Sequence, residues 1–503
     1  MSKLRYIKLN ASERLEVLRN NGLFMYLFNL DIGREETPHS WLYEHIPTKV
    51  VLDRWKKIFK SKLPKSEFSD LITEFDFRVE EKTKDGGQGK IPPIMTPEAQ
   101  EAIEPLYAES PSDDEFYLEQ YFSRAADFAK TLFGANNVAR SHRRPITKVL
   151  DSMRERDTLV TNSGWPRFTK RNKVYDLEVE DAQSGKAFQY PAIALFRQYR
   201  GKLRLVWMYP MSMNLLEYQF SQVIQDAVRN SPTQWVREWV SPWVGFTQVK
   251  ETITMQYSSF DQIIGGDTTK MDANMRPAQI RLVFEIVKHL FVKSEWDALY
   301  RCMMQINTIQ LVTGKNRKLL GTHGLASGSG WTQLVETVLV MFIAWNLGYT
   351  GQGIGDDFIW CAKLTDEQIV NALNQFGLPA NPAKQTVAAD YTTFLQRLFI
   401  RGFFSREDKN VLGGYYSTLW ALYSMLQPEK FHSPKQWNKD MFATRIAMIA
   451  ENCVDCPIFP EFAKFVAKGH PYLIKFAKMS DDYLDKVQTE SRNLPGLTPS
   501  YNQ

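Results

Sequence analysis

Two adjacent carboxylates, Asp356 and Asp357, lie in the segment GIGDDFIW between short apolar runs that are typical of β-strands. Like charges side by side repel each other near a protein core, so the pair predicts a bound cation beside it. The alternative is a polar hairpin tip, because Gly-Asp turns between strands are common. A second acidic pair, Asp481 and Asp482, lies in a polar, helix-like context and is assigned no catalytic role.

The segment GGDTTKMDANM carries two further carboxylates, Asp267 and Asp272, where a strand is expected to pass into a turn and a helix. If this segment lies beside the Asp356 turn, Asp267 joins that pair and three carboxylates can bind two Mg²⁺ ions, with Mn²⁺ as the alternative metal. Two such ions about 4 Å apart activate an attacking hydroxyl and neutralise a leaving pyrophosphate. The chemistry that this arrangement predicts is nucleotidyl transfer.

A Gly/Ser loop, SGSGWT at residues 327–332, leads directly into a helix that is expected to run from Trp331 to about Leu347. Such a loop exposes backbone N–H groups and hydroxyls to an anion or a sugar. Alone it would carry little weight. The order of the three segments along the chain strengthens this interpretation of the loop, because the acidic strand comes first, the loop and its helix second, and the Asp356 turn third.

Other elements follow from hydrophobic periodicity. A helix that begins near Pro277 is predicted to be amphipathic, with an apolar face of Ile280, Val283, Phe284, Val287 and Phe291. A helix is expected over residues 366–376, and a strand pair around FLQRLFIRGFF at residues 394–404. The aromatic-rich sequence beyond residue 410 predicts packed helices.

Length and charge narrow the class of protein. At 503 residues the chain exceeds what one core normally serves, so several subdomains are expected. Residues 140–204 contain 15 Lys or Arg against 7 Asp or Glu, although the whole chain carries only +5. Bases interleaved with aromatics and glycines predict a phosphate or nucleic-acid partner, and a solvated basic face is the alternative.

The sequence predicts neither export nor a membrane span, because it has no signal-peptide segment and its longest apolar run is far below the roughly 20 residues required. Four cysteines in so long a chain indicate a reducing, intracellular setting. Cys453 and Cys456 form a C-x-x-C pair, but without a second ligand pair they are interpreted as two ordinary cysteines near a helix end.

The three motifs in this order resemble motifs A, B and C of viral RNA-dependent RNA polymerases, and most of all those of picobirnaviruses, which have segmented double-stranded RNA genomes. The matching residues are Asp267 with Asp272, the loop from Ser327-Gly328 to Thr332, and Gly355-Asp356-Asp357. The resemblance implies template-directed RNA synthesis from nucleoside triphosphates. The resemblance covers roughly residues 140–405 with recognisable motifs. Outside this range the chain resembles these polymerases only in its size and general character.

The resemblance also implies an α+β, right-hand fold with fingers, an antiparallel palm sheet flanked by helices, and a mainly helical thumb. We therefore expect seven divisions. They are an N-terminal extension with part of the fingers (1–135), fingers (136–250), palm with motif A (251–292), a fingers insertion (293–326), palm with motifs B to E (327–405), thumb (406–490) and a C-terminal tail (491–503), which could gate initiation.

Further site residues follow from the resemblance alone. TNSGWP resembles the template-guiding motif, and FLQR resembles the motif that supports the growing strand, so the expected RNA-binding residues are Ser163, Gly164, Trp165, Pro166, Lys170, Arg171, Gln396 and Arg397. The expected nucleotide-binding residues are Arg204, Lys202, Asp272, Ser327, Gly328, Thr332 and Glu336, with Arg200 a weaker candidate. Lys384 is similar to the general acid that protonates pyrophosphate.

One position departs from the family. Glu336 stands where these polymerases often have an asparagine that, with the second aspartate of motif A, reads the ribose 2′-hydroxyl. Ser327 and Thr332 are therefore expected to supply hydrogen bonds to that hydroxyl.

The implied partners are RNA template and nascent strand, nucleoside triphosphates and a viral capsid protein, and the implied location is the virus particle interior and the host cytoplasm. A reverse transcriptase could use the same two-metal palm, although the second aspartate of motif A favours RNA synthesis by resemblance. The alternative from another class is a non-catalytic, RNA-binding structural protein of a particle.

Overall fold

The computed structural model describes residues 4–78 and 87–494. The chain divides into two compact units. The first unit comprises Met1–Gly33, Pro93–Phe196 and Leu205–Ala389, and the second comprises Arg34–Pro92, Arg197–Arg204 and Asp390–Gln503. Each unit is therefore assembled from segments that lie far apart in the sequence.

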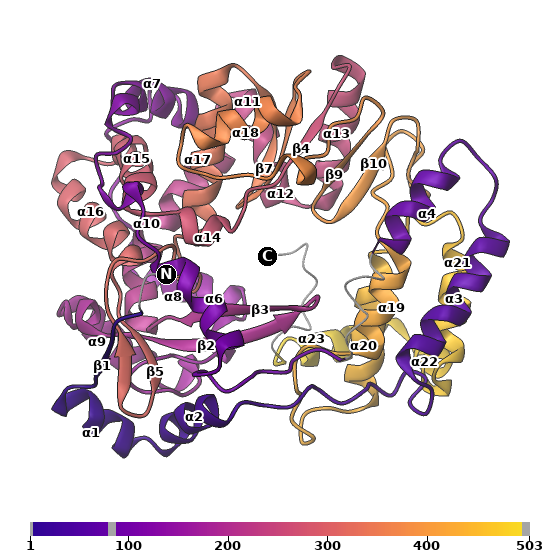
Figure 1. Cartoon of the computed structure of the whole chain (residues 1–503), viewed down its shortest axis with the longest axis horizontal. Coiled ribbons are helices and arrows are strands. Elements are labelled where there is room, and N and C mark those ends of the chain that lie inside the picture. The colour runs from indigo at the N-terminus through magenta and orange to yellow at the C-terminus, as the bar shows by residue number, and fades with distance from the viewer. Residues whose placement is uncertain (1–3, 79–86, 495–503) are drawn as a thin grey trace. The chain divides into compact units, whose positions relative to one another are not determined.

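The first unit consists of helices around two sheets (Figure 1). Its helices are α1 (Ala11–Arg19), α2 (Asn21–Ile32), α6 (Pro97–Tyr107), α7 (Phe122–Phe133), α8 (Ile146–Glu155), α9 (Tyr175–Gln183), α10 (Met211–Arg229), α11 (Gln234–Trp239), α12 (Ser241–Val244), α13 (Phe246–Ser259), α14 (Met271–Asn274), α15 (Pro277–Val287), α16 (Trp296–Met304), α17 (Thr332–Leu347) and α18 (Asp366–Asn374). The helix predicted from Trp331 to Leu347 is confirmed as α17.

The smaller sheet is antiparallel and has the order β4-β8-β7, with β4 at Ile264–Gly266, β7 at Thr350–Ile354 and β8 at Asp357–Cys361. The larger sheet has the order β1-β6-β5-β2-β3, with β1 at Tyr6–Lys8, β2 at Ala192–Tyr199, β3 at Lys202–Met208, β5 at Leu311–Gly314 and β6 at Arg317–Leu319. It is mixed, because β2 and β5 run parallel. The outer ends of β2 and β3, residues 197–204, belong to the second unit.

The helix α15 differs from its prediction. Pro277 does begin it and its sequence is amphipathic as predicted, but it ends at Val287, which leaves Phe291 outside the helix. Every residue from Pro277 to Val287 except Arg281 is also buried, so both faces of the helix are enclosed. Arg281 is covered as well, because its guanidinium lies over the rings of Phe116 and Tyr300. The charged residue Arg281 therefore does not mark a solvent-exposed face of this helix.

The second unit is mainly helical, as the sequence beyond residue 410 predicted. Its helices are α3 (Thr48–Lys62), α4 (Ser69–Phe77), α19 (Thr418–Leu426), α20 (Lys439–Glu451), α21 (Phe459–Lys468), α22 (Pro471–Phe476) and α23 (Asp481–Ser491). The strand pair predicted at FLQRLFIRGFF is the hairpin of β9 (Tyr391–Phe394) and β10 (Arg397–Ile400). Its two-residue turn, Leu395 and Gln396, has positive φ at both positions, as hairpin turns of this length favour.

A buried carboxylate, Asp76, joins α4 to the start of α19 inside the second unit. Its oxygens accept hydrogen bonds from the hydroxyls of Tyr415, Ser417 and Thr418 and from the N–H groups of Thr418 and Leu419. The backbone donors lie at the N-terminus of a helix, where a negative charge is favoured. Asp76 therefore supplies the first turn of α19 with an acceptor from a distant segment.

We expect Asp76→Ala to lower the free energy of unfolding by about 3 kcal/mol or more, because several buried donors lose a charged acceptor. Urea denaturation measures this loss. Asp70→Asn is the matched control: this carboxylate lies in the first turn of α4 and is exposed, so the change should stay within about 0.5 kcal/mol. An equal effect of both variants would contradict the role of Asp76.

The predicted divisions of the chain stay predictions, and the compact units cut the chain elsewhere. The second unit begins its last segment at Asp390, whereas the thumb was predicted from residue 406, and residues 34–92 of the predicted N-terminal extension share that unit. Residues 495–503 of the predicted tail lie outside the described residues. Leu494 is buried against Met441 and Val487. No helix in the described ranges has the length and apolar character that a bilayer crossing requires.

Candidate active site

The register of the smaller sheet brings the two acidic motifs together. Strand β4 pairs with β8 so that Gly266 lies opposite Phe358. Because the pairing is antiparallel, Asp267, which follows Gly266, lies beside Asp357, which precedes Phe358. Asp356 is exposed in the turn between β7 and β8, and Asp267 and Asp357 are half-buried. The three predicted carboxylates thus converge at one end of this sheet.

A fourth carboxylate, Glu336, lies behind the turn. It is buried in the first turns of α17, which packs on β7 (Figure 1), and its Oε2 lies 3.2 Å from where a Cβ on Gly355 would stand. Burial raises the pKa of Glu336 well above its ordinary value, and the negative charges of Asp272 and Asp356 raise it further. The position that departs from the family therefore faces both acidic motifs.

The described residues contain no group of three or more His, Cys, Asp or Glu side chains that could hold a metal ion as they stand. The carboxylate side chains at this end of the sheet are nevertheless suitable ligands for a metal ion. Carboxylate oxygens are the ligands that Mg²⁺ and Mn²⁺ prefer. Burial is the main cause of the raised pKa of Glu336, and the charges of Asp272 and Asp356 add to it; a divalent cation beside Asp356 would offset those charges.

Lys384 and Gln385 connect the site to the segment after α18. Lys384 Nζ lies 3.6 Å from Asp267 Oδ2, and both side chains are about half exposed. The Gln385 side chain accepts from the Asp267 N–H at 3.0 Å and donates to the Asp267 carbonyl at 2.8 Å. Lys384 thus lies beside Asp267, and its role as general acid stays a prediction. Gln385 was missed, because nothing in the sequence showed that its amide would pair with the backbone of Asp267.

The SGSGWT loop crosses the end of β3 and enters α17 at Thr332. A Cβ on Gly328 would lie 1.7 Å from the carbonyl oxygen of Trp207, so the loop can approach this strand only with glycine. Thr332 Oγ1 donates to the Ser329 carbonyl at 3.1 Å. Ser327 Oγ is buried and has no hydrogen-bond partner among the described residues. The hydroxyl predicted to face the ribose therefore retains its capacity for a hydrogen bond.

A family model of viral RNA-dependent RNA polymerase matches residues 199–412, a range that contains Asp267, Asp272, the SGSGWT loop and the Asp356 turn. These residues form a viral RNA-dependent RNA polymerase domain. The chain is 25% identical to the potential RNA-dependent RNA polymerase of human picobirnavirus over an alignment of 516 residues. This alignment covers 96% of this chain and 91% of that protein. It is also 25% identical over 182 residues to the RNA-directed RNA polymerase of Cryptosporidium parvum virus 1, covering 36% of this chain and 32% of that one. The chain is thus of the RNA-directed RNA polymerase class.

Solved structures agree on the fold of the polymerase. The crystal structure of the RNA-dependent RNA polymerase of a human picobirnavirus matches with a TM-score of 0.79 and 22% identity, covering 98% of this chain and 95% of that chain. The crystal structure of its insertion loop deletion mutant matches with a TM-score of 0.78 and 21% identity, covering 97% of both chains. The predicted α+β, right-hand fold is confirmed.

The TNSGWP loop of the polymerase packs on the start of α10. Ser163 and Trp165 are buried, and a Cβ on Gly164 would lie 2.5 Å from the Tyr209 carbonyl oxygen. The Arg171 guanidinium donates to the Asn162 carbonyl and to Asn214 Oδ1 at 3.1 and 2.9 Å, and burial lowers its pKa. Pro166 is half-buried and Lys170 exposed. Of these predicted RNA-binding residues, Lys170 is the one whose side chain is exposed.

The remaining predicted residues belong to the second unit. Lys202 and Arg204 are exposed on β3, as a nucleotide-binding role requires. Arg200, the weaker candidate, lies over the Trp420 ring and donates to Gln396, an exposed residue of the FLQR turn. Arg397 is buried and donates to the carbonyl oxygens of Gly414 and Asn452. These contacts indicate that Arg397 stabilises the unit and is not presented to RNA.

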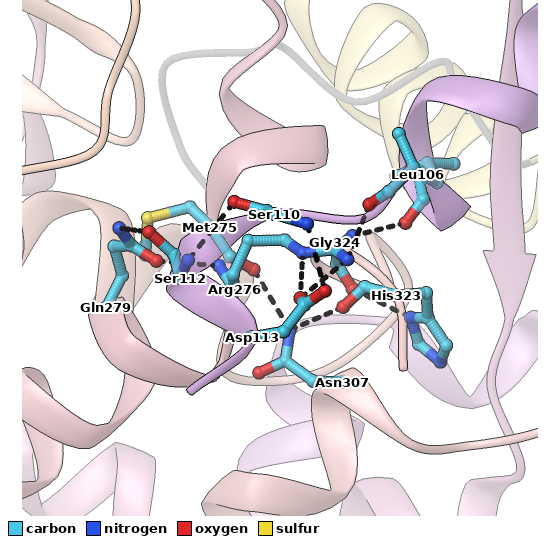
Figure 2. A network of polar contacts seen from close by, with 11 residues as sticks. Leu106, Ser110, Ser112, Asp113, Met275, Arg276, Gln279, Asn307, His323 and Gly324 are labelled. Atoms are coloured by element: carbon cyan, nitrogen blue, oxygen red, sulfur yellow. Dashed lines mark hydrogen bonds and ion pairs between the residues drawn. The ribbon is translucent and has the colours of Figure 1, made fainter. Parts of the chain in front are cut away.

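A network around Arg276 fixes the segment that follows Asp272 (Figure 2). The Arg276 guanidinium, 1% exposed, donates to Asp113 Oδ1 at 2.6 Å and to the carbonyl oxygens of Leu106 and Ala108. Asn307 Nδ2 donates to the Met275 carbonyl at 2.9 Å. The role of Arg276 could not be predicted from the sequence, because its partners lie more than 160 residues away. A lone arginine immediately before Pro277 was the available signal, and it is a weak one.

Proposed function

We propose that the polymerase copies RNA templates into complementary RNA and thereby replicates and transcribes a viral double-stranded RNA genome. The observation that carries the proposal is the register of β4 and β8, which brings Asp267 beside Asp357 and next to Asp356. Nucleoside triphosphates would be the substrates and pyrophosphate the leaving group. The 25% identity with the picobirnavirus protein along 96% of this chain supports the double-stranded RNA genome.

In this reaction Asp267, Asp356 and Asp357 would hold two divalent ions, Mg²⁺ or alternatively Mn²⁺. When bound, such ions activate the primer 3′-hydroxyl and neutralise the triphosphate. Gln385 keeps Asp267 in place through two hydrogen bonds to its backbone. Glu336 lies behind the Gly355 turn, and the charges of Asp272 and Asp356 raise its pKa.

Lys384 would donate the proton that pyrophosphate takes up as it departs. Its ammonium group is within 3.6 Å of Asp267, so it lies beside the proposed metal ligands, and its exposure allows it to be reprotonated from solvent. Arg204 and Lys202 would bind the triphosphate. Asp272, Ser327 and Thr332 would contact the sugar, with Gly328 placing the loop.

The template and nascent strand would contact the exposed Lys170 and Gln396, with Ser163, Gly164, Trp165, Pro166 and Arg171 giving the template loop its shape. We further propose a viral capsid protein as partner, and the particle interior and host cytoplasm as the places of action. The resemblance to polymerases that work inside particles supports both proposals.

The test is incorporation of each of the four labelled ribonucleotides on homopolymeric single-stranded RNA, with Mg²⁺ and with or without a complementary primer. Template-directed synthesis predicts that only the complementary nucleotide is incorporated on each template. Incorporation that ignores the template would indicate a terminal transferase. RNA binding without any incorporation, even with primer and Mn²⁺, would favour a structural RNA-binding protein.

Sugar selection offers a finer prediction. We expect Asp272→Ala to reduce the preference for ribonucleotides over deoxyribonucleotides by about tenfold, because the 2′-hydroxyl loses a hydrogen-bond partner worth about 1.4 kcal/mol. The ratio of kcat/KM for ATP and dATP on one template measures this preference. An unchanged ratio in the variant would remove Asp272 from sugar selection.

A further inference from the structure

A buried carboxylate that no motif contains lies beneath the SGSGWT loop. Glu217, on α10, has no exposed surface. Its Oε1 accepts a hydrogen bond from Ser329 Oγ at 2.5 Å, and its Oε2 accepts from the Gly330 N–H at 2.7 Å and from Asn214 Nδ2 at 3.0 Å. Both oxygens are therefore engaged, and two of the three donors belong to the loop.

These contacts fix the middle of the loop. Ser329 Oγ also accepts from the Trp331 N–H at 3.1 Å, and Asn214 Nδ2 also donates to the Gly328 carbonyl at 3.3 Å. A Cβ on Gly330 would lie 2.6 Å from the Tyr218 ring, so the loop lies directly on α10. Glu217 is thus the anchor between Gly328 on one side and the first turn of α17 on the other.

Burial and hydrogen bonding act on the charge of this anchor in opposite directions. Burial raises the pKa of Glu217 to about 7, while the hydrogen bonds from Ser329, Gly330 and Asn214 act to lower it. The other titratable groups that sense its charge are Tyr209 at the end of β3, Tyr218 on α10 and Cys302 on α16, and the pKa of each is raised. Arg171 is linked to Glu217 through Asn214 and through Tyr218.

We propose that Glu217 is a positioning residue for nucleotide binding: its ionised carboxylate holds Ser329 and Gly330 so that Ser327 and Thr332 face the incoming sugar. The proposal rests on the proposed function, because it assigns the SGSGWT loop to the nucleotide. A charged acceptor binds its donors more strongly than a neutral one, so the loop is better ordered when Glu217 is ionised. Glu217 itself touches neither nucleotide nor metal.

Glu217→Gln is the appropriate variant, because an amide has nearly the shape and hydrogen-bonding pattern of a protonated carboxyl. Wild type and variant should therefore behave alike where Glu217 is protonated and differ where it is ionised. We expect the KM for nucleotide to be roughly fivefold higher in the variant at about pH 8.5 and nearly equal at about pH 6, with kcat changing less. A thermal midpoint close to that of wild type verifies that the variant folds.

Two further measurements make the test decisive. Titration of a fluorescent nucleotide into the protein–template complex measures the dissociation constant without turnover, so absence of incorporation by wild type would count against the proposed function and not against Glu217. Glu285→Gln is the control, since Glu285 is 8% exposed and pairs with Arg281 and Lys288. Its KM ratio to wild type should not change with pH. A Glu217→Gln ratio that is constant with pH, or equal to one throughout, would overturn the proposal.

Discussion

Asp267→Asn should reduce ribonucleotide incorporation at least about 10³-fold, because it removes one carboxylate of the proposed metal site while leaving the side chain's size unchanged. The substitution leaves the backbone of Asp267 where it is, since Gln385 bonds its N–H and carbonyl and not its side chain. The loss would therefore report on chemistry and not on folding. Steady-state incorporation on a primed template at saturating nucleotide measures it.

Asp366→Asn is the matched control for this change. Asp366 is a partly exposed carboxylate in the first turn of α18, in the same compact unit. We expect its activity to stay within about twofold of wild type, because a surface charge away from the site contributes little. Incorporation by Asp267→Asn at a rate close to this control would show that Asp267 is not part of the reacting site.

Gly328→Ala should lower activity by about 100-fold and the free energy of unfolding by about 2–4 kcal/mol. A Cβ at this position would lie 1.7 Å from the Trp207 carbonyl oxygen and 2.9 Å from its carbon, and backbone atoms of a strand cannot move aside as a flexible side chain can. The loop must therefore shift, and with it Ser327 and Thr332. Incorporation kinetics and thermal denaturation together measure both effects.

Gly22→Ala provides the comparison for the glycine change. Gly22 lies in the first turn of α2, where a Cβ would meet Asn20 Oδ1 at 3.4 Å and the Phe168 ring at 3.8 Å, both ordinary contacts. We expect a change within about 0.5–1 kcal/mol and in the stabilising direction, because alanine favours helix more than glycine does. Normal activity in Gly328→Ala would mean that the loop does not need its close approach to β3.

Most of the elements that could be predicted were predicted from patterns within short sequence segments. Two carboxylates at a Gly-Asp turn and apolar residues at helical spacing after Trp331 are properties of short segments, so β7, β8 and α17 could be predicted from them. The meeting of Asp267 with Asp357 could be expected only from the order of the motifs. Strand pairing across about 90 residues of sequence then fulfilled that expectation.

The supporting residues could not be predicted, because their partners are distant in sequence. Glu217 bonds Ser329 across 112 residues, Gln385 bonds Asp267 across 118, and Arg276 bonds Leu106 across 170. Nothing in a lone Glu, Gln or Arg shows that it will be buried. For the same reason Arg397, which looked available for RNA, is buried and bonded to Asn452.

Glu336 shows both what the sequence can reveal about a site residue and what only the fold can reveal. The sequence showed that it departs from the family pattern, but only the fold shows that it is buried against the Gly355 turn and close to Asp272 and Asp356. A departure at a surface position would have meant little. Here it changes the group that faces the proposed sugar site.

The most direct test of the central claim compares wild type with Asp356→Ala for incorporation of labelled ribonucleotides on single-stranded RNA, with Mg²⁺ and at equal RNA-binding occupancy. We expect incorporation by wild type and its loss in the variant, with RNA affinity unchanged. This result would show that the adjacent carboxylates serve metal-dependent RNA synthesis. RNA binding by both proteins with incorporation by neither, even with a primer and Mn²⁺, would contradict the account.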